Sequence, residues 1–338
     1  MSALFPHPLL VCDIGGTNVR IGLVRTLGGP IERLDPQLTA HFPSFELMLA
    51  HVLQACSLSP RSLLMSAAGP LHNRKISLTN APWILDGPSI AKTFGLAQGL
   101  LLNDFESLAF SLPSLGPDQT RTFGDDPPSR EGPQLILGPG TGLGLSLLIQ
   151  TRDGYSALPS EAGHIGLGPM SEEDFSIWPF IERPLGRVSA ETLLSGPGLT
   201  RLHQARLKSL GHMNTEALSA QQISHEARLN PDSEAAKSLR YFWRLIAQFT
   251  GDMAICFAAS GGVTLAGGVL PKIQSFIDPH SFRRIFMAKP PMQSFLEKLP
   301  IRMIVDDSAA LSGLVSIATT PDQFTIDYSK RLCVDASP

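Results

Sequence analysis

The sequence of 338 residues lacks the patterns that define several common classes of protein. Its four cysteines, Cys12, Cys56, Cys256 and Cys333, lie far apart with no CxxC pair, so neither a zinc ribbon nor a disulfide framework is indicated. No apolar run approaches the roughly 18 residues that span a bilayer. The first residues, MSALFPHPLLVCD, lack the basic segment of a signal peptide. We therefore expect a protein of the reducing cytoplasm that does not enter a membrane.

Charge is also scarce in this chain. Charged residues make up 17% of it and the formal net charge is −3, with no Lys/Arg block. Electrostatics therefore gives no reason to expect nucleic acid or an anionic membrane as a partner. Hydrophobic residues make up 43%, and there are 30 glycines and 28 prolines, which is typical of a folded, turn-rich enzyme. The length predicts two domains.

The usual phosphate-binding motifs are missing as well. No GxxxxGK[ST] segment occurs, which excludes a Walker A loop, and GPGTGLG does not have the GxGxxG spacing of a dinucleotide-binding turn. Residues 12–24, CDIGGTNVRIGLV, instead have the pattern of two strands joined at a tip that carries Asp13, Gly15 and Gly16. Bare amides at such a tip could hold an anion. The alternative is a purely structural turn.

The stretch QLILGPGTGLGLSLLI at 134–149 repeats this plan of strand, glycine-rich tip and strand. Superposing the two stretches aligns Gly16-Thr17 with Gly140-Thr141, which suggests a duplicated fold, although glycine-rich hairpins are common enough for a chance match. Two such tips could grip a polyphosphate without any lysine. A third glycine pair, at 267–268, is expected to open a helix and to accommodate a nucleoside.

The order of apolar patterns predicts an α/β fold. Strands are expected at 8–13, 19–24, 62–67 and 99–103, and helices at 45–56, 88–94 and 105–112. A Pro/Gly-rich stretch at 113–133 then marks a boundary or a surface excursion. A long amphipathic helix at about 232–259, capped by Asp232 or Ser233, is expected to pack in the core. Strand 301–305 and helix 308–318 close the chain.

Polar residues gather on the turns of this pattern. An apolar strand ends on Asn103 and Asp104, where α/β folds present functional side chains, and an Asp there could act as a general base. Glu161 and His164 lie in SEAGHIGLG, and Glu191 lies just inside a predicted helix. Each of these residues alone has a structural explanation, such as a helix cap or a histidine buried in the core. Metal binding by Glu161 and His164 would need more ligands nearby. Together they suit the hydrogen bonding of a ring of hydroxyls.

Seven motifs in order carry a resemblance to a known family: DIGGTN, LTNAPW, LLNDF, GPGTGLG, EAGH, SAETLLSGPGL and LAGGV. With them the chain resembles, over nearly its whole length, the bacterial ATP-dependent glucokinases of the hexokinase/actin-like superfamily. The resemblance implies a two-domain α/β fold with duplicated ribonuclease-H-like topology around a central cleft. A small domain would comprise 1–115, completed by about 304–338, and a large domain 116–303.

The resemblance also implies the reaction, in which the γ-phosphoryl group of ATP passes to the 6-hydroxyl of D-glucose at the entry to glycolysis, with Mg²⁺ as cofactor. Asp104 would be the general base, and the sugar would contact Asn80, Asn103, Asp104, Glu161, His164 and Glu191. The nucleotide would lie against Asp13, Ile14, Gly15, Gly16, Thr17, Gly140, Thr141, Gly142, Gly267 and Gly268. Asp13 would help hold Mg²⁺ through water, and no direct metal ligand is identified. Members of the family are often homodimers, so a homodimer is expected.

Two departures and two alternatives accompany this hypothesis. The family's Gly-Glu-Gly-Gly-His run is Ser-Glu-Ala-Gly-His here, so Ala162 is expected to constrain the backbone that presents Glu161. The stretch 113–133 has no assigned role. One alternative is a kinase for another hexose, such as fructose or mannose. The other is a non-catalytic sugar sensor, against which the missing helix-turn-helix segment and zinc motif argue.

Overall fold

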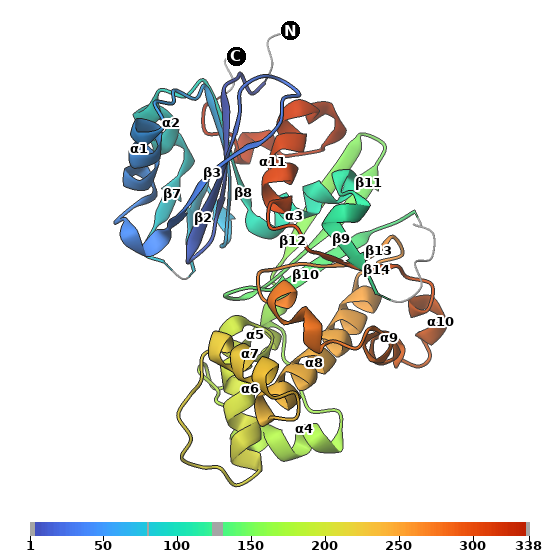
Figure 1. Cartoon of the computed structure of the whole chain (residues 1–338). Coiled ribbons are helices and arrows are strands. Elements are labelled where there is room, and N and C mark those ends of the chain that lie inside the picture. Colours follow the sequence, from blue (N-terminus) through green and yellow to red (C-terminus); the bar gives the residue numbers. More distant parts are fainter. Residues whose placement is uncertain (1–3, 80, 124–130, 336–338) are drawn as a thin grey trace. The chain divides into compact units, whose positions relative to one another are not determined.

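The computed structural model describes residues 4–79, 81–123 and 131–335, which fold as two compact units of mixed α/β structure (Figure 1). Unit 1 comprises Met1–Gln119, Leu147–Pro159 and Asp306–Pro338, and unit 2 comprises Thr120–Ser146 and Ser160–Val305. The segment Leu147–Pro159 thus groups with unit 1, although the sequence placed it within the predicted domain 116–303.

The sheet of unit 1 has the strand order β3-β2-β1-β4-β8. Its strands are β1 (Leu9–Ile14), β2 (Asn18–Val24), β3 (Glu32–Leu38), β4 (Ser62–Ala67) and β8 (Gln98–Asn103). β1 pairs antiparallel with β2 and parallel with β4, and β4 pairs parallel with β8. The predicted strands in this region are confirmed to within one residue at each end. The edge strand β3 was missed because its sequence, ERLDPQL, is mostly polar and exposed.

The second sheet has the order β12-β11-β10-β13-β14-β9. Its strands are β9 (Thr120–Thr122), β10 (Gln134–Pro139), β11 (Leu143–Thr151), β12 (Gly154–Ser160), β13 (Gly262–Leu265) and β14 (Ile301–Ile304). When the strands β10 to β14 are numbered in chain order, their spatial order is third, second, first, fourth, fifth. The five strands of the first sheet have the same spatial order. The predicted duplication is therefore confirmed. β9 adds a strand that pairs antiparallel with β14.

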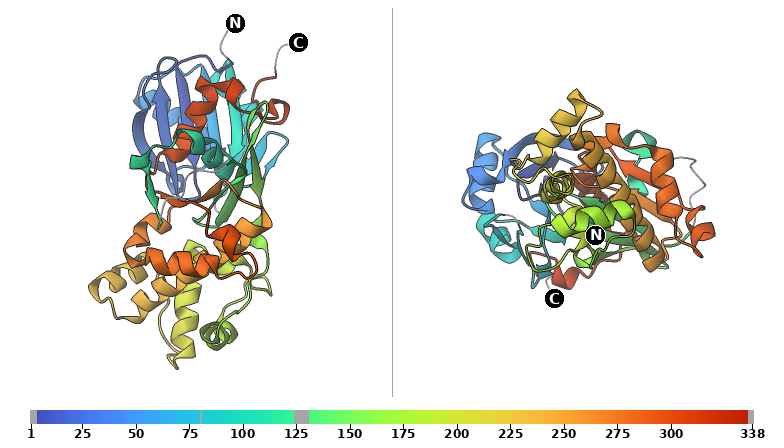
Figure 2. Two further views of the ribbon diagram at one scale, coloured as in Figure 1. Left: turned by 90° about the vertical axis from the view of Figure 1, so that its right-hand side faces the viewer. Right: turned by 90° about the horizontal axis from the view of Figure 1, so that it is seen from below.

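Helices cover both faces of the first sheet. They are α1 (Phe45–Ala55), α2 (Gly87–Phe94), α3 (Asp104–Ser111) and α11 (Ala309–Thr319). Figure 1 shows α1 and α2 on one face of this sheet and α3 and α11 on the other. In Figure 2 the red helix α11 lies beside the blue strands of this sheet, which it contacts although they are far away in the sequence. A small antiparallel sheet comprises β5 (Leu71–His72), β6 (Lys75–Ser77) and β7 (Ile84–Asp86).

The helices of unit 2 pack around α8 (Glu234–Cys256), which contacts strands β10 and β13. Ser233 caps α8 by accepting a hydrogen bond from the amide of Ala236, as predicted. The apolar stripe of α8 is buried, which confirms that it is a packing surface. The other α-helices are α4 (Glu172–Ile177), α5 (Ala190–Leu193), α6 (Gly196–Ser209), α7 (Ala220–Leu229), α9 (Pro279–Met287) and α10 (Gln293–Leu296).

Short 3₁₀ helices complete both units: Thr39–His41, Leu112–Ser114, Pro117–Gln119, Ala162–His164, Trp178–Phe180, Leu270–Phe276, Pro321–Gln323 and Tyr328–Lys330. The helix expected after the glycine pair at 267–268 is the 3₁₀ helix Leu270–Phe276. Residues 124–130 of the predicted boundary stretch lie outside the described residues. Of the helices that the structure describes, none combines the length and the apolar character that a membrane crossing requires.

We predict that Gly313 is essential for the close packing of α11 on α3. A Cβ atom at Gly313 would lie 2.2 Å from the carbonyl oxygen of Ser107. In an open helix, Gly→Ala stabilises by about 1 kcal/mol. Here Gly313→Ala is expected to lower the free energy of unfolding by about 1–3 kcal/mol because the helices are forced apart. Denaturant unfolding measures this change. Ser312→Ala, next to it on α11, is the control, and a stabilised Gly313→Ala variant would contradict the prediction.

Candidate functional site

The first glycine-rich turn joins β1 to β2 in unit 1. The Gly15 amide donates to the Asn18 carbonyl at 2.9 Å, which closes the turn. The Thr39 hydroxyl donates to the Gly15 carbonyl at 3.1 Å, and the Thr39 amide donates to the Thr17 carbonyl at 3.0 Å, so the loop is held from a second side. Thr17 and Asn18 are exposed. The turn thus presents its outer edge to solvent, as a phosphate-binding loop must.

Asp13 lies at the end of β1, beside this turn. Its carboxylate accepts a hydrogen bond from the Ser66 hydroxyl at 3.0 Å and from Arg20 Nη1 at 3.2 Å. Burial raises the pKa of Asp13, and the positive charge of Arg20 opposes that rise. Arg20 Nε also lies 3.8 Å from Oδ2 of Asp307. The carboxylate is therefore held on both oxygens by neighbouring groups.

Arg20 and Ser66 were missed by the sequence analysis, although the hairpin pattern contains a signal for Arg20. Arg20 is the direct cross-strand partner of Asp13 in the β1–β2 pair, and Ser66 is its partner in the β1–β4 pair. The register of a short hairpin follows from its turn. Counting outward from the glycine tip would have placed Arg20 opposite Asp13.

Asn103 and Asp104 form the junction where β8 ends and α3 begins. The Asn103 side-chain oxygen accepts from the amides of Phe105 and Glu106 at 3.0 and 3.3 Å, so Asn103 is the N-cap of α3. Its Nδ2 donates to the Gly69 carbonyl at 3.1 Å. Asp104 is the first helical residue, and its Oδ1 accepts from the Phe105 amide at 3.0 Å. The capping explanation for Asn103 is thus correct, and the same cap fixes the backbone of Asp104.

The second glycine-rich turn, in unit 2, joins β10 to β11. The Gly140 amide donates to the Gly142 carbonyl at 2.8 Å, and the Gly140 carbonyl accepts from the Gly196 amide at 2.9 Å. This turn lies against the glycine pair at 267–268: a Cβ atom on Gly267, whose φ is +86°, would lie 2.4 Å from the Pro139 carbonyl oxygen. The Gly267 turn therefore contacts the end of β10, directly before the Gly140 turn, through bare backbone.

Glu161, His164 and Glu191 come together in unit 2. His164 Nε2 lies 3.6 Å from Glu161 Oε2, and His164 Nδ1 lies 3.9 Å from Glu191 Oε1. The other oxygen of Glu191 accepts from the Leu143 amide at 2.8 Å. Glu161 and His164 are exposed, with side chains 73% and 56% accessible. The group therefore offers carboxylate and imidazole atoms to a polar ligand from a surface-accessible position.

The backbone that presents this group departs from expectation in one respect. Ala162 begins the 3₁₀ helix Ala162–His164 and is not among the residues with a positive φ. Alanine adopts helical backbone freely, so the constraint expected from the missing glycine does not arise at this position. Gly163, by contrast, packs closely: its Cβ would lie 2.3 Å from the Leu143 carbonyl oxygen. Arg187, which the sequence analysis did not single out, donates to the His164 carbonyl.

The predicted site residues thus fall into two groups. Unit 1 holds Asp13, Ile14, Gly15, Gly16, Thr17, Asn103 and Asp104, and unit 2 holds Gly140, Thr141, Gly142, Glu161, His164, Glu191, Gly267 and Gly268. Asn80 lies outside the described residues. Within the described ranges, no group of three or more His, Cys, Asp or Glu side chains is arranged to hold a metal ion directly.

Comparisons with known proteins identify the family. The model of the glucokinase family matches residues 10–321. A glucokinase from Sinorhizobium medicae is 35% identical over 97% of this chain and 96% of that protein, and one from Brucella suis is 33% identical over 97% and 95%. The crystal structure of a glucokinase from an Antarctic psychrotroph is 27% identical, with a TM-score of 0.77 over 92% of this chain and 98% of that chain.

A more distant structure shares the fold alone. It is a ROK-family glucokinase from Streptomyces griseus in complex with glucose and AMPPNP, 21% identical, with a TM-score of 0.58 over 91% of this chain and 98% of that chain. The duplicated sheets and these matches define an ATP-dependent sugar kinase with the actin-like fold. The chain belongs to the glucokinase family. It is accordingly a kinase for glucose.

We predict that Gly142 keeps the Glu191 carboxylate in place. A Cβ atom at Gly142 would lie 2.4 Å from Glu191 Oε2, so Gly142→Ala is expected to displace that carboxylate from the Leu143 amide. Because Glu191 is predicted to bind glucose, the KM for glucose should rise at least about tenfold, since a hydrogen bond to a charged group contributes roughly 1.5–3 kcal/mol. Steady-state kinetics with varied glucose measures the effect. Gly168→Ala, which has no atom within 4 Å of the added carbon, is the control. An unchanged KM in Gly142→Ala would refute the prediction.

Proposed function

We propose that Asp104 is the general base of the glucokinase reaction, in which the 6-hydroxyl of D-glucose attacks the γ-phosphorus of ATP. An oxygen of its carboxylate takes the hydroxyl proton as the new O–P bond forms and the bond to ADP breaks, giving glucose 6-phosphate. The observation that carries this proposal is the place of Asp104, directly after the carboxyl end of β8, on a backbone fixed by the Asn103 cap. A carboxylate oxygen is a suitable acceptor for the hydroxyl proton.

The sugar hydroxyls are bound by Glu161, His164 and Glu191, with Asn103 and Asn80 as further contacts. Each carboxylate accepts from two hydroxyls, and the imidazole can donate or accept. The short distances among the three unit 2 side chains support this assignment, because a hexose presents adjacent hydroxyls at similar spacing. Bidentate contacts of this kind discriminate between epimers, since a misplaced hydroxyl leaves a carboxylate oxygen unpaired.

The two glycine-rich turns, Gly15–Thr17 and Gly140–Gly142, are assigned to the ATP phosphates, and Gly267 and Gly268 to the adenosine. The amides of Gly15 and Gly140 close their own turns, so the amides of Gly16, Thr17, Thr141 and Gly142 are the proposed phosphate donors. Few side chains need to contact the phosphates, because phosphoryl transfer depends mainly on the alignment of the reacting groups and on neutralisation of the phosphate charge. The contact of Gly267 with Pro139, the residue directly before the Gly140 turn, supports one continuous nucleotide surface in unit 2.

Mg²⁺ is the cofactor of the proposed reaction and would neutralise phosphate charge. Asp13 fits a role in holding Mg²⁺. Ser66 donates to one oxygen of the Asp13 carboxylate and Arg20 donates to the other. Because a carboxylate offers about four acceptor positions, it can accept further hydrogen bonds from metal-bound water. Mg²⁺ commonly keeps several waters and uses one or two carboxylates, which suits contact with Asp13 through water. A cytoplasmic location and a homodimer remain predictions.

We predict that Asp104→Asn lowers kcat by several orders of magnitude, because the amide cannot accept the hydroxyl proton. Glucose binding, measured by calorimetry or intrinsic fluorescence, should be largely retained, since the other sugar contacts are unchanged. Asp118→Asn, an exposed aspartate in the same unit, is the control. Near-normal turnover in Asp104→Asn would overturn the base assignment.

A coupled ATP assay across six hexoses tests the substrate. We expect the highest kcat/KM with glucose, because the family to which the chain belongs is that of glucokinases. A higher value with fructose or mannose would favour the alternative hexose kinase and would leave the role of Asp104 unaffected.

A further inference from the structure

The first turn of α3 contains a buried carboxylate beside the catalytic junction. Glu106 is 2% exposed and is the third residue of the helix. One of its oxygens accepts from Nε and Nη2 of Arg331 at 3.0 and 2.8 Å, and the other accepts from the Asn103 amide at 3.4 Å. Burial raises the pKa of Glu106, and Arg331 opposes the rise. The carboxylate therefore links the C-terminal segment to the residue that caps α3.

The backbone of Arg331 is attached to the strand that carries Asp104. Its carbonyl accepts from the Leu101 amide at 3.1 Å, and the Cys333 amide donates to the Gly99 carbonyl at 2.9 Å. Leu332 forms an antiparallel bridge with Leu100. The segment 331–334 thus continues the sheet beyond β8, which would otherwise be its edge strand.

The fit of this segment is close. A Cβ atom on Gly99 would lie 2.8 Å from the Cys333 sulfur, and one on Gly87 would lie 2.9 Å from it. Burial raises the pKa of the Cys333 thiol to about 12, so the thiol stays protonated and serves to fill space in the core.

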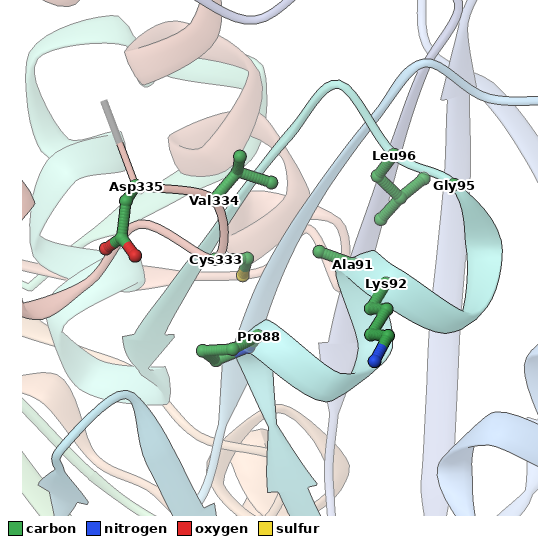
Figure 3. Close-up of a pocket in the computed structure, with 8 residues that line it drawn as sticks. All are labelled: Pro88, Ala91, Lys92, Gly95, Leu96, Cys333, Val334 and Asp335. Atoms are coloured by element: carbon green, nitrogen blue, oxygen red, sulfur yellow. The ribbon is translucent and has the colours of Figure 1, made fainter. Parts of the chain in front are cut away.

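Figure 3 shows Cys333, Val334 and Asp335 opposite α2 across an open pocket of about 460 Å³. None of the predicted site residues lines this pocket.

We propose that Arg331 and Glu106 are positioning residues for Asp104, a proposal that rests on the role of Asp104 as general base. Arg331 holds β8 through its backbone and α3 through its side chain, and Asp104 lies at the point where these two elements meet. Glu106 transmits the contact because its second oxygen binds the Asn103 amide. Neither residue takes part in the proton transfer itself.

The expected effect is on kcat. A displacement of about 1 Å at a reacting group can cost about a hundredfold in rate. Removal of Arg331 leaves the Glu106 carboxylate buried without its cation, and the first turn of α3 must rearrange to solvate it. The sugar contacts of unit 2 are built on other elements, so the KM for glucose should change little.

The experiment compares Arg331→Met, Arg331→Lys, Glu106→Gln and the double variant Arg331→Met/Glu106→Gln in the full chain. Arg331→Met should lower kcat about 10- to 100-fold with KM values for glucose and ATP within about threefold. Arg331→Lys, which keeps the charge but not the planar fork, should retain more activity. The double variant should lose less than the two single losses combined, because the amide introduced by Glu106→Gln is neutral and its oxygen still accepts from the Asn103 amide.

Arg74→Met is the matched control. Arg74 pairs with Asp335 in the same C-terminal segment, away from α3, so its removal should leave kcat unchanged. Circular dichroism at the assay temperature corrects each rate for the folded fraction. The proposal is overturned if the corrected kcat of Arg331→Met lies within about threefold of the wild type, or if the single losses are additive. The Asp104→Asn variant separates the two hypotheses. If Asp104→Asn is active, the assignment of Asp104 as general base is refuted. If Asp104→Asn is inactive and Arg331→Met is active, only the positioning role is refuted.

Discussion

The need to pair a buried carboxylate fixes the junction between β8 and α3. An uncompensated charge in the interior costs on the order of several kcal/mol even after relaxation, so the Glu106 carboxylate requires its arginine partner. Arg331 supplies two N–H groups to one oxygen, and the same residue pairs by its backbone with Leu101. These contacts hold the strand and the helix together where they meet, and Asp104 lies at that meeting point. Its place is set by long-range contacts as much as by the local Asn103 cap.

In unit 2, glycines constrain the backbone in a comparable way, because neighbouring groups occupy the space that a side chain would fill. The Gly142 turn has room for the Glu191 carboxylate only because it carries no Cβ, and the Gly267 turn approaches Pro139 for the same reason. The Leu143 amide then donates to Glu191, so the backbone proposed to face phosphate also orients a carboxylate proposed to face sugar. A side chain added at Gly142 or at Gly267 would therefore collide with the group that each glycine now approaches.

Much of the fold could be predicted from the sequence, because apolar strands and glycine-rich tips repeat with a regular pattern in both sheets. The pairing of Asp13 with Arg20 was also within reach, since hairpin register places them opposite each other. The strand β3 was missed because its exposed, polar sequence has no apolar alternation. The contact between Glu106 and Arg331 could not be predicted: the two residues are 225 positions apart, and a single long-range ion pair leaves no periodic signal.

Unit 1 is built from segments at both ends of the sequence, which has a consequence for the chain during its synthesis. Its main sheet combines β1, β2, β3, β4 and β8 with residues 331–334, whereas unit 2 lies entirely before residue 306. During synthesis the outer edge of β8 must wait until residues 331–334 have left the ribosome, and an open strand edge is a template for wrong pairing. All residues of unit 2 are therefore synthesised before unit 1 is complete, and the outer edge of β8 is covered only by one of the last segments of the chain.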